Sequence, residues 1–510
     1  MAACRMLDTT ETKGVKRVQE DCSGVSAEAP SAGPGRRMAA AVRGLFDPVD
    51  GAALALFRML FGALMAAETF YRVFPQIDPV YAPGRFHFTY PYLEWVRPWP
   101  GAGMYAQVIV MGFAALGLML GYRTRVSALV FFVAYTHLWL IDASTFNNHF
   151  YLISLIAAFF TVTGSNACWS LDNLRMPPRG EGWVPRWNVW LLRFQFVVVY
   201  FYGGIAKLNG DWLRGEPLRN WISRRAEGTL LESMLVTEGA VDFFAYGGLL
   251  FDLCIGFLLL YRKTRLPAFV MLVFFHCTNS WLFKIDVFPW LALAATVVFF
   301  EPDAPRRWLQ FVDVHVPPPA PRPVWTTGVW ARAAILTGLI LFGVVQLAVP
   351  LRHFLYKGNV NWTDEGHTFS WHMKMSHRVA STVFEVRDPD TGQTWTIGNR
   401  EQLQDLAPRQ RLEMIARPHF ILQYAHYLAE KHRGQGVKQP EVRVRSIVSL
   451  NGRPMQPLID PAVNLARESV SPWRTPDWVL PLPEGLPIGN YPARTEEPQM
   501  PPRGGAPASP

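Results

Sequence analysis

The amino-acid sequence predicts a polytopic α-helical membrane protein with eight or nine transmembrane helices and a small C-terminal β-rich α+β domain outside the membrane. Half of the 510 residues are hydrophobic and only 17% are charged, a composition typical of membrane proteins with soluble parts attached. Apolar runs long enough to cross a bilayer recur through the first two-thirds of the chain. From Arg352 onward the sequence instead mixes aromatic, histidine and methionine residues with short alternating segments.

The apolar runs give the expected helices in chain order. The eighth run is short and carries Pro289, so we expect it to be tilted, broken or re-entrant. The number of membrane spans is therefore eight or nine within a helical domain over 46–351. The runs lie near residues 52–71, 104–121, 126–142, 147–164, 188–207, 241–261, 266–283, 287–300 and 331–350.

Basic loops set the expected orientation of an integral, multi-pass membrane protein. We interpret residues 1–45 as a disordered cytoplasmic tail, because they lack the apolar core of a signal peptide. The loops that then become cytoplasmic all contain arginine, as the positive-inside rule requires. Everything from Arg352 onward is accordingly predicted to be extracytoplasmic. The cytoplasmic loops are 122–125, 173–186, 261–265 and 302–322.

The extracytoplasmic domain is expected over residues 352–480, followed by a loose Pro-rich tail over 481–510. Within the domain, the pattern predicts a hairpin, a mainly helical stretch and a half-buried strand that ends at a strong turn signal, Asn451-Gly452. In that order they occupy residues 379–397, 401–433 and 441–450.

One lysine stands out in the fifth apolar run. Between Leu191 and Ile205 only Arg193 and Gln195 are neither apolar nor aromatic, and Lys207 follows shortly after Gly203-Gly204. Burial in such a segment disfavours the charged form of a lysine, so Lys207 could offer a neutral amine as a base. The alternative is a lysine that snorkels from a helix end toward headgroups or water.

Further polar candidates lie at the predicted outer ends of other helices. Asn148 and His149 open the fourth helix, while His276 and Asn279 lie one turn apart on the seventh. Each pair could serve a reaction, or could only form hydrogen bonds between helices.

Aromatic residues beyond the last span are candidates for a ligand pocket. Phe369, Trp371 and Met373 could wall a flat aromatic ligand, although such clusters also form ordinary cores. No metal site is predicted, since none of the five cysteines shows metal-ligand spacing. The net charge of +9 is spread out rather than gathered with aromatics, which excludes a nucleic-acid-binding surface.

Taken together, six ordered motifs resemble the vitamin K-dependent gamma-glutamyl carboxylase family, whose membrane part is called the HTTM domain. The resemblance runs from about Phe57 to Trp473 and suggests a short bacterial-type homologue. The motifs are FNNHFYL (146–152), GGIAKLNGDW (203–212), LLFDLCIGFLL (249–259), FFHCTNSWLF (274–283), NWTDEGHTFSW (361–371) and the VSLN–IDP–SPW series near 448–473.

The resemblance implies an enzyme that oxygenates reduced vitamin K, a naphthohydroquinone of the menaquinol or phylloquinol type, with O2 to the epoxide. That oxygenation would drive carboxylation of a glutamate by CO2, so the implied partners are the bilayer, a quinone and a Glu-containing peptide or protein. By its place in GGIAKLNGDW, Lys207 resembles the family's base. His149 resembles the histidine that assists carboxylation, with Asn148 as its neighbour.

The chain departs from the animal enzymes at several positions. Ala206 replaces a second lysine, and Gly366-His367 replaces a Leu-Tyr pair tied to the glutamate substrate. Tyr90-Pro91 and His426-Tyr427 occupy the neighbourhoods of a cysteine pair. Two alternatives therefore stay open: a quinol epoxidase that does not carboxylate protein, and a non-catalytic membrane protein that binds a lipid or quinone.

Overall fold

The computed structural model describes residues 33–81, 84–175, 182–283, 285–316, 318–324, 327–398, 403–469 and 474–489. Contacts divide the chain into two units, Met1–Leu45 and Phe46–Pro510. The helical part and the C-terminal part thus belong to one compact unit. The first unit contains helix α1 (Pro34–Gly44), where we expected a disordered tail. Its Ala-rich sequence has high helix propensity, and a proline in the first turn is compatible with a helix; residues 1–32 lie outside the described part.

In the second unit, every predicted apolar run forms a helix. The first run forms the longest continuous helix, because α2 continues through a π-helical turn and a 3₁₀ turn into α3. The helices are α2 (Ala52–Glu68), η1 (Thr69–Val73), η2 (Phe74–Gln76), α3 (Ile77–Tyr81), α4 (Gly103–Leu120), α5 (Thr124–Leu140), α6 (Asn148–Val162), α8 (Arg186–Lys207), α11 (Glu238–Leu260), α12 (Arg265–Phe283), α13 (Phe288–Ala295), η5 (Thr296–Phe299), α15 (Val329–Ala348) and η6 (Val349–Leu355).

Six of these helical segments in the described residues are long and apolar enough to cross a membrane. They include Ala52–Tyr81 and Val329–Leu355 as continuous stretches. Three further apolar helices are shorter: Thr124–Leu140, Asn148–Val162 and Phe288–Phe299. A helix rises about 1.5 Å per residue and a bilayer core is about 30 Å thick. These three helices are shorter than that thickness, so their length does not identify them as membrane spans. The expected count of eight or nine therefore stays a prediction.

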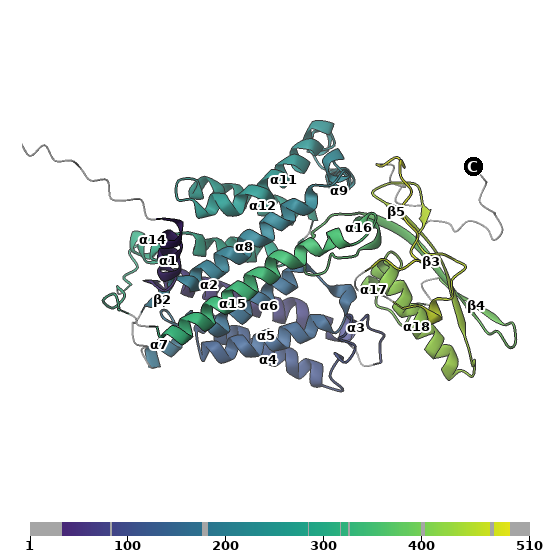
Figure 1. Ribbon diagram of the computed structural model, residues 1–510, viewed down its shortest axis with the longest axis horizontal. Coiled ribbons are helices and arrows are strands. Elements are labelled where there is room, and N and C mark those ends of the chain that lie inside the picture. Colours follow the sequence, from purple (N-terminus) through teal and green to yellow (C-terminus); the bar gives the residue numbers. More distant parts are fainter. Residues whose placement is uncertain are drawn as a thin grey trace, which may run out of the picture. The chain divides into compact units, whose positions relative to one another are not determined.

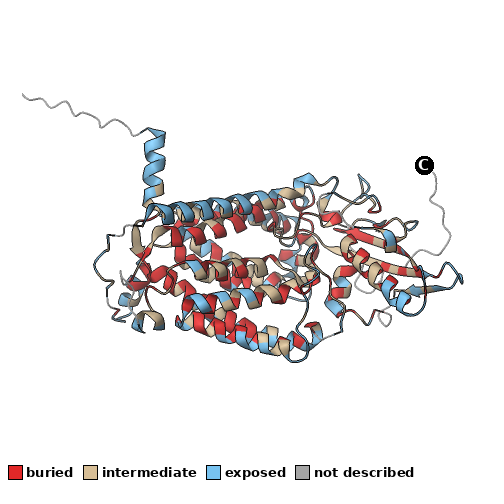
Figure 2. Ribbon diagram, turned by 60° about the horizontal axis from the view of Figure 1, so that its bottom comes forward, coloured by how far each residue is buried: buried red, intermediate tan, exposed pale blue. Residues whose placement is uncertain are grey.

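The helices pack tightly where glycine removes a side chain. On α8, a Cβ added to Gly204 would lie 2.8 Å from the backbone nitrogen of Leu253 on α11. On α11, a Cβ added to Gly256 would lie 3.0 Å from the Cα of Val197 on α8. These two helices can therefore approach closely along their length. Figure 2 shows buried residues gathered toward the middle of the helical part, while α15 has Gln346 as its one buried residue.

The C-terminal part is built on a four-stranded antiparallel sheet in the order β4-β3-β5-β6 (Figure 1). Both the hairpin and the central strand that the sequence predicted are confirmed, with Arg378 opposite Leu450 and Arg387 opposite Glu441. The helical stretch is also confirmed, and a proline starts each of its two helices. The elements are β3 (Arg378–Arg387), β4 (Thr394–Ile397), β5 (Glu441–Leu450), β6 (Gln456–Pro457), α17 (Pro408–Met414) and α18 (Pro418–Gly434).

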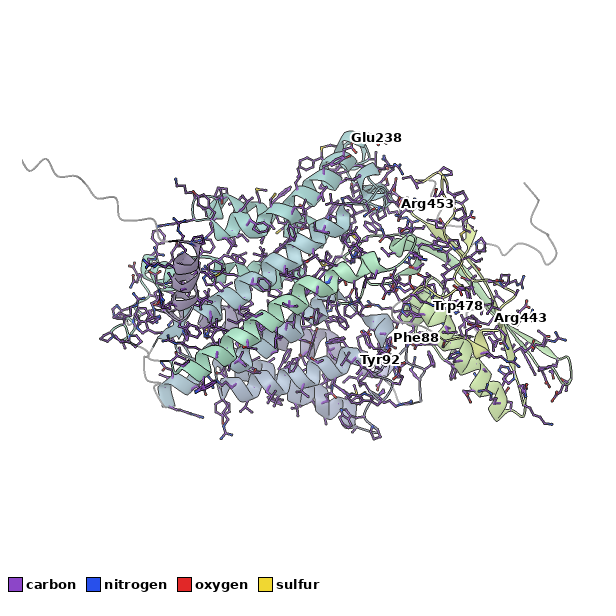
Figure 3. All side chains as sticks on the ribbon, viewed as in Figure 1. Phe88, Tyr92, Glu238, Arg443, Arg453 and Trp478 are labelled. Atoms are coloured by element: carbon purple, nitrogen blue, oxygen red, sulfur yellow. The ribbon has the colours of Figure 1, made fainter. Side chains whose placement is uncertain are left out.

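The core of this sheet includes a residue from the membrane part of the sequence. Phe88, between α3 and α4, packs in one hydrophobic cluster with Phe384 of β3, Phe420 of α18 and Trp478 (Figure 3 labels Phe88 and Trp478). The remaining short elements are β1 (Pro48–Asp50), paired with β2 (Trp183–Pro185), and α7 (Leu171–Arg175), α9 (Leu218–Ala226), α10 (Glu232–Leu235), α14 (Ala304–Phe311), α16 (Val360–Thr363), η3 (Ala143–Thr145), η4 (Trp212–Arg214) and η7 (Leu465–Arg467). Residues 481–489 contain no helix or strand, and 490–510 lie outside the described residues.

Candidate functional site

Lys207 is the last residue of α8 and lies inside the protein, with 7% of its surface exposed. Its Nζ donates a hydrogen bond to Oδ2 of Asp252 at 2.5 Å and another to the carbonyl oxygen of Gly203 at 3.1 Å. The indole of Trp212 lies 5.1 Å from Nζ, a distance at which its ring face attracts a cation. The amine thus points into the protein rather than toward solvent. It is held in an ion pair, which neither sequence interpretation had anticipated.

Asp252, the partner of Lys207, lies on α11 and is only 4% exposed. Sequence reasoning missed Asp252 as a site residue, although a carboxylate within the apolar run LLFDLCIGFLL is an unusual feature. An ionisable residue inside a membrane segment is costly to bury and is commonly functional. That signal was available from the sequence, but the identity of its partner was not.

Gly203 opens the face of α8 on which this pair lies. A Cβ added there would lie 3.3 Å from Oδ2 of Asp252 and 3.4 Å from Cε of Met373. Met373, a predicted pocket residue, therefore reaches the same spot as the carboxylate. The structure brings Met373 and Lys207 together from segments that are far apart in the sequence.

Met373 belongs to a loop with an unusual backbone. Phe369, Trp371 and Lys374 all have positive φ angles, of 62°, 60° and 53°. Residues other than glycine adopt this left-handed region at an energetic cost, so such residues gather where the surroundings enforce them. One enforcing contact comes from the start of α6, where Nδ2 of Asn148 donates to the carbonyl oxygen of His372 at 2.7 Å. Asn148, a predicted site residue, is thus hydrogen-bonded to the loop that carries Met373.

Several buried polar atoms near this contact have no partner within the described structure. They include Oδ1 of Asn148, Nε2 of His149 and Nε1 of Trp371. Buried polar groups are nearly always hydrogen-bonded, so each unpaired atom needs an explanation. A ligand that carries hydroxyl and carbonyl groups could supply the missing partners.

Aromatic side chains cover the same loop. Trp371 is fully buried and stacks on Tyr151 of α6 with a centroid distance of 5.3 Å and an interplanar angle of 27°. Phe369 meets the edge of Tyr151 at 5.0 Å and of Phe146 at 5.3 Å. The hydroxyl of Tyr151 accepts a hydrogen bond from Nε2 of Gln346 on α15 at 2.7 Å. Phe369 and Trp371 therefore form an aromatic wall with α6.

His276 and Asn279 lie on α12. The Tyr200 hydroxyl of α8 lies within hydrogen-bonding distance, 2.7 Å, of Nε2 of His276. This is the helix-to-helix bond that the structural interpretation of His276 expected. Tyr200 is seven residues before Lys207, so both lie on one face of α8. Asn279 is half-buried one turn further along α12.

A second buried ion pair fixes the segment after Lys207 to the sheet. The carboxylate of Asp211 accepts hydrogen bonds from both Nη atoms of Arg453 at 2.7 Å and from Nδ2 of Asn451 at 2.8 Å. Burial acts to raise the pKa of Asp211, but the hydrogen bonds from Arg453 and Asn451 outweigh it and the pKa is lowered. Asn451 is the predicted turn residue; it is fully buried and also accepts a bond from the backbone of His377. The turn therefore anchors the C-terminal sheet beside the Lys207 segment.

Three histidines lie together beside the Asn148 contact, with His367 stacked on His372 and His353 edge-on to it. The ring of His372 lies 4.4 Å from that of His367 and 4.8 Å from that of His353, measured between centroids. Burial, together with the two neighbouring histidines, lowers the pKa of His372 to about 2. His372 is therefore neutral at physiological pH. Among the described residues, no group of three or more His, Cys, Asp or Glu residues is arranged to hold a metal ion.

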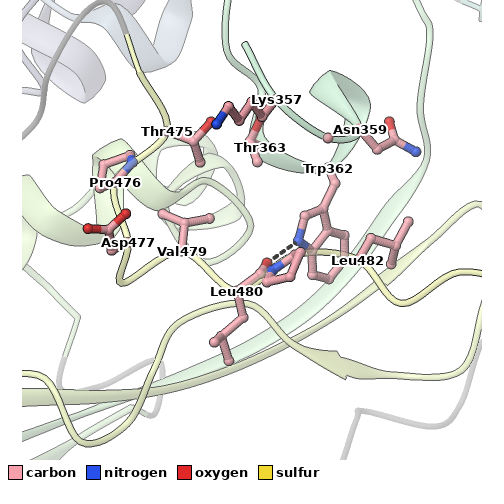
Figure 4. A pocket seen from close by; sticks show the side chains of 12 residues that line it. Lys357, Asn359, Trp362, Thr363, Thr475, Pro476, Asp477, Val479, Leu480 and Leu482 are labelled. Carbon is pink, nitrogen blue, oxygen red and sulfur yellow. Dashed lines mark hydrogen bonds between the residues drawn. The ribbon is translucent and has the colours of Figure 1, made fainter.

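A cleft of about 340 Å³ opens elsewhere, in the C-terminal part (Figure 4). Trp362 lies along it and donates from Nε1 to the carbonyl oxygen of Leu480 at 2.8 Å, while Lys357 and Asp477 contribute charge. None of the residues that line this cleft is one of the predicted site residues.

The fold and this arrangement define a helical membrane protein with a buried lysine–aspartate pair. Hydrogen bonds from Arg453 and Asn451 to Asp211 hold its C-terminal sheet domain beside that pair. The family model of the HTTM domain matches residues 46–304, about half of the chain, and that of the vitamin K-dependent gamma-carboxylase lumenal domain matches residues 331–485. The chain belongs to the vitamin K-dependent gamma-carboxylase family, as its motifs predicted. No solved structure matches the chain at a significant level.

Proposed function

We propose that the protein is a membrane enzyme that couples oxygenation of a reduced naphthoquinone to its epoxide with carboxylation of a glutamate by CO2. The observation that carries this proposal is the buried amine of Lys207, held 2.5 Å from Asp252 beside Met373 and the loop that binds Asn148. A base shielded from water at the end of a membrane helix suits a lipid-soluble hydroquinone.

Each candidate residue has a role that its surroundings support. Lys207 takes a proton from a hydroxyl of the reduced quinone. The unpartnered Oδ1 of Asn148 and Nε2 of His149 are available to orient the ligand and to assist the carboxylation step. Phe369, Trp371 and Met373 provide flat apolar surface, with His276 and Asn279 as further candidates on α12.

The residues present fit a naphthohydroquinone on two counts. Unpaired buried polar atoms near the start of α6 match the two hydroxyl groups of such a ligand, and the stacked Trp371 and Tyr151 match its fused aromatic rings. When bound, the reduced quinone and O2 supply the oxidative chemistry, and CO2 supplies the added carboxyl group. We further propose a cytoplasmic N-terminus and an extracytoplasmic C-terminal domain, on the basis of the basic loops.

One observation favours a second candidate, a quinol epoxidase that does not carboxylate protein. Gly366 has φ 72°, and a Cβ added there would lie 2.7 Å from the Cα of His353. A leucine, as the animal enzymes carry at this point, would not fit without a shift of the backbone. The part of the family's site tied to glutamate therefore differs in this chain.

The test is an assay of purified protein with reduced vitamin K, O2, labelled bicarbonate and a Glu-containing peptide. Epoxide together with label in the peptide is the expected result. Epoxide without label would support the second candidate. Absence of both products, with quinone still bound, would leave a non-catalytic quinone-binding protein and overturn the enzyme assignment.

A further inference from the structure

We propose that Asp252 is a positioning residue that acts through Lys207 by accepting its proton, so that the amine becomes a base when an apolar hydroquinone enters. This inference rests on the function proposed above and adds a residue to it. The pair joins the end of α8 to the middle of α11, across 45 residues of sequence.

The geometry leaves Lys207 little freedom. Its Nζ makes two hydrogen bonds, to Oδ2 of Asp252 and to the carbonyl oxygen of Gly203. Because residue 203 is a glycine, the carboxylate can lie against the helix at this level, where an added Cβ would be only 3.3 Å from Oδ2. The lysine is thus aimed at the carboxylate, and the lone pair it needs as a base is not free while Nζ is an ammonium.

The surroundings of the pair decide where its proton lies. Tyr200 on α8 lies near Asp252 and is bonded to His276 on α12, and neither brings a permanent charge. The charge of Asp211, four residues after Lys207, is compensated by Arg453. Two opposite charges are stabilised by water, and burial without water favours the neutral forms of both groups. Entry of an apolar ligand beside the pair removes water and therefore favours transfer of the proton from nitrogen to oxygen.

The proposed step is balanced within the pair and its ligand. One N–H bond of the Lys207 ammonium breaks, an O–H bond forms at Oδ2 of Asp252, and the electron pair remains on Nζ. The free amine then accepts a proton from a hydroxyl of the hydroquinone, whose bonding electrons remain on its oxygen. The pair ends with one additional proton, which it releases to water after turnover.

The variants Asp252→Asn and Asp252→Glu test this role, with Asp242→Asn as the matched control. Asp242 is an exposed carboxylate ten residues earlier on the same helix. Epoxide formation is measured with reduced vitamin K and with a naphthoquinol whose hydroxyls are more acidic, and quinone binding is measured in parallel. We expect Asp252→Asn to bind quinone within threefold of the wild type but to form epoxide at least 100-fold more slowly.

The acidic quinol separates a role in proton transfer from a role in folding. A weaker base suffices for a more acidic hydroxyl, so the defect of Asp252→Asn should shrink at least tenfold with that substrate. Asp252→Glu keeps the carboxylate and should retain at least a tenth of wild-type activity. Three results would each overturn the proposal. The first is an Asp252→Asn rate of epoxide formation within threefold of the wild type, and the second is an equal loss of rate with both quinols. The third is a folded Asp252→Glu variant that is as inactive as Asp252→Asn.

Failure of the proposed function is recognised separately. If the wild type forms no epoxide from either quinol, the reaction proposed above is wrong. The pairing is then judged from the rate at which a membrane-permeable amine reagent modifies Lys207, read by mass spectrometry. Bound oxidised quinone should raise that rate at least tenfold in the wild type, because transfer of the proton to Asp252 frees the amine, and an unchanged rate would overturn the role of Asp252.

Discussion

At the scale of single residues, the site depends on charged groups that are buried in pairs. Lys207 lies against Asp252, and Asp211 lies against Arg453. Removing one member of such a pair leaves the other charge buried and alone, which is more damaging than the loss of an exposed pair. The two pairs differ in their expected consequences, because the first serves the proposed reaction and the second joins two parts of the fold.

Lys207→Met is expected to lower epoxide formation by at least about 100-fold, since general bases contribute about 10²–10⁴ to rates. Methionine keeps most of the side-chain volume and the apolar character of the site. Quinone affinity should therefore change little. Turnover is measured as epoxide by chromatography and affinity by titration of the oxidised quinone; a variant that keeps more than a tenth of wild-type turnover contradicts Lys207 as the base.

Arg453→Met is expected to destabilise the protein by about 3 kcal/mol, because it leaves the buried carboxylate of Asp211 without its bidentate partner. Arg443→Met on β5 is the control, since Arg443 is half-exposed and lies 3.9 Å from Glu441. That control should change stability by less than about 1 kcal/mol. Thermal unfolding in detergent measures both, and equal shifts for the two variants would contradict the anchoring role.

At the scale of elements, the relative position of α8 and α11 determines whether Lys207 can reach Asp252. Gly204 follows Gly203, whose carbonyl oxygen accepts a hydrogen bond from Nζ, and a Cβ added to Gly204 would lie 2.8 Å from the backbone nitrogen of Leu253, the residue after Asp252. The same glycine pair therefore sets both the spacing of the helices and the access to the ion pair.

Gly204→Ala should force the two helices apart, because the new Cβ would lie 2.8 Å from the backbone nitrogen of Leu253. Overpacking of this kind costs about 1–3 kcal/mol, and the longer Lys207–Asp252 distance should also reduce epoxide formation. Gly247→Ala on α11 is the control, as an added Cβ there meets nothing within 4 Å. Thermal unfolding and turnover are measured for both; a Gly204→Ala protein as stable and active as the control contradicts this packing.

At the scale of the whole molecule, partly buried histidines with lowered pKa values should make the fold sensitive to acid. The folded protein holds the pKa of His372 at about 2 through burial and the neighbouring His367 and His353, and burial also lowers the pKa of His377 and His419 to about 4. In the unfolded chain a histidine binds a proton near pH 6.5. Their stabilising contribution is therefore complete above about pH 6.5 and is lost as the pH falls below it.

For His372 alone this loss amounts to about 1.4 kcal/mol for each pH unit below 6.5, or about 2 kcal/mol at pH 5. His372→Gln should consequently lose less stability than the wild type between pH 7.5 and pH 5. His315→Gln, a change at an exposed histidine, is the control and should follow the wild type. Thermal unfolding midpoints at the two pH values measure the effect, and identical losses in all three proteins would contradict it.

The sequence by itself determined the elements of this protein and the family to which it belongs. Apolar runs form helices whatever their neighbours, because in lipid the backbone must satisfy its own hydrogen bonds. The alternating stretch at Glu441–Leu450 and the Asn451-Gly452 turn likewise carry their structure in local preference. Lys207, Asn148 and Met373 were recognised as candidates on the same basis, by unusual residue types in conspicuous positions.

Only the tertiary structure decided which of these residues meet. The bonds from Lys207 to Asp252, from Asn148 to His372 and from Arg453 to Asp211 join positions 45, 224 and 242 residues apart. Such pairings depend on how helix faces interlock and on a strained loop held between them, and no local preference of the chain specifies either. That is why the sequence pointed to a lysine, while its carboxylate partner became apparent only when α8 and α11 were seen packed through their glycines.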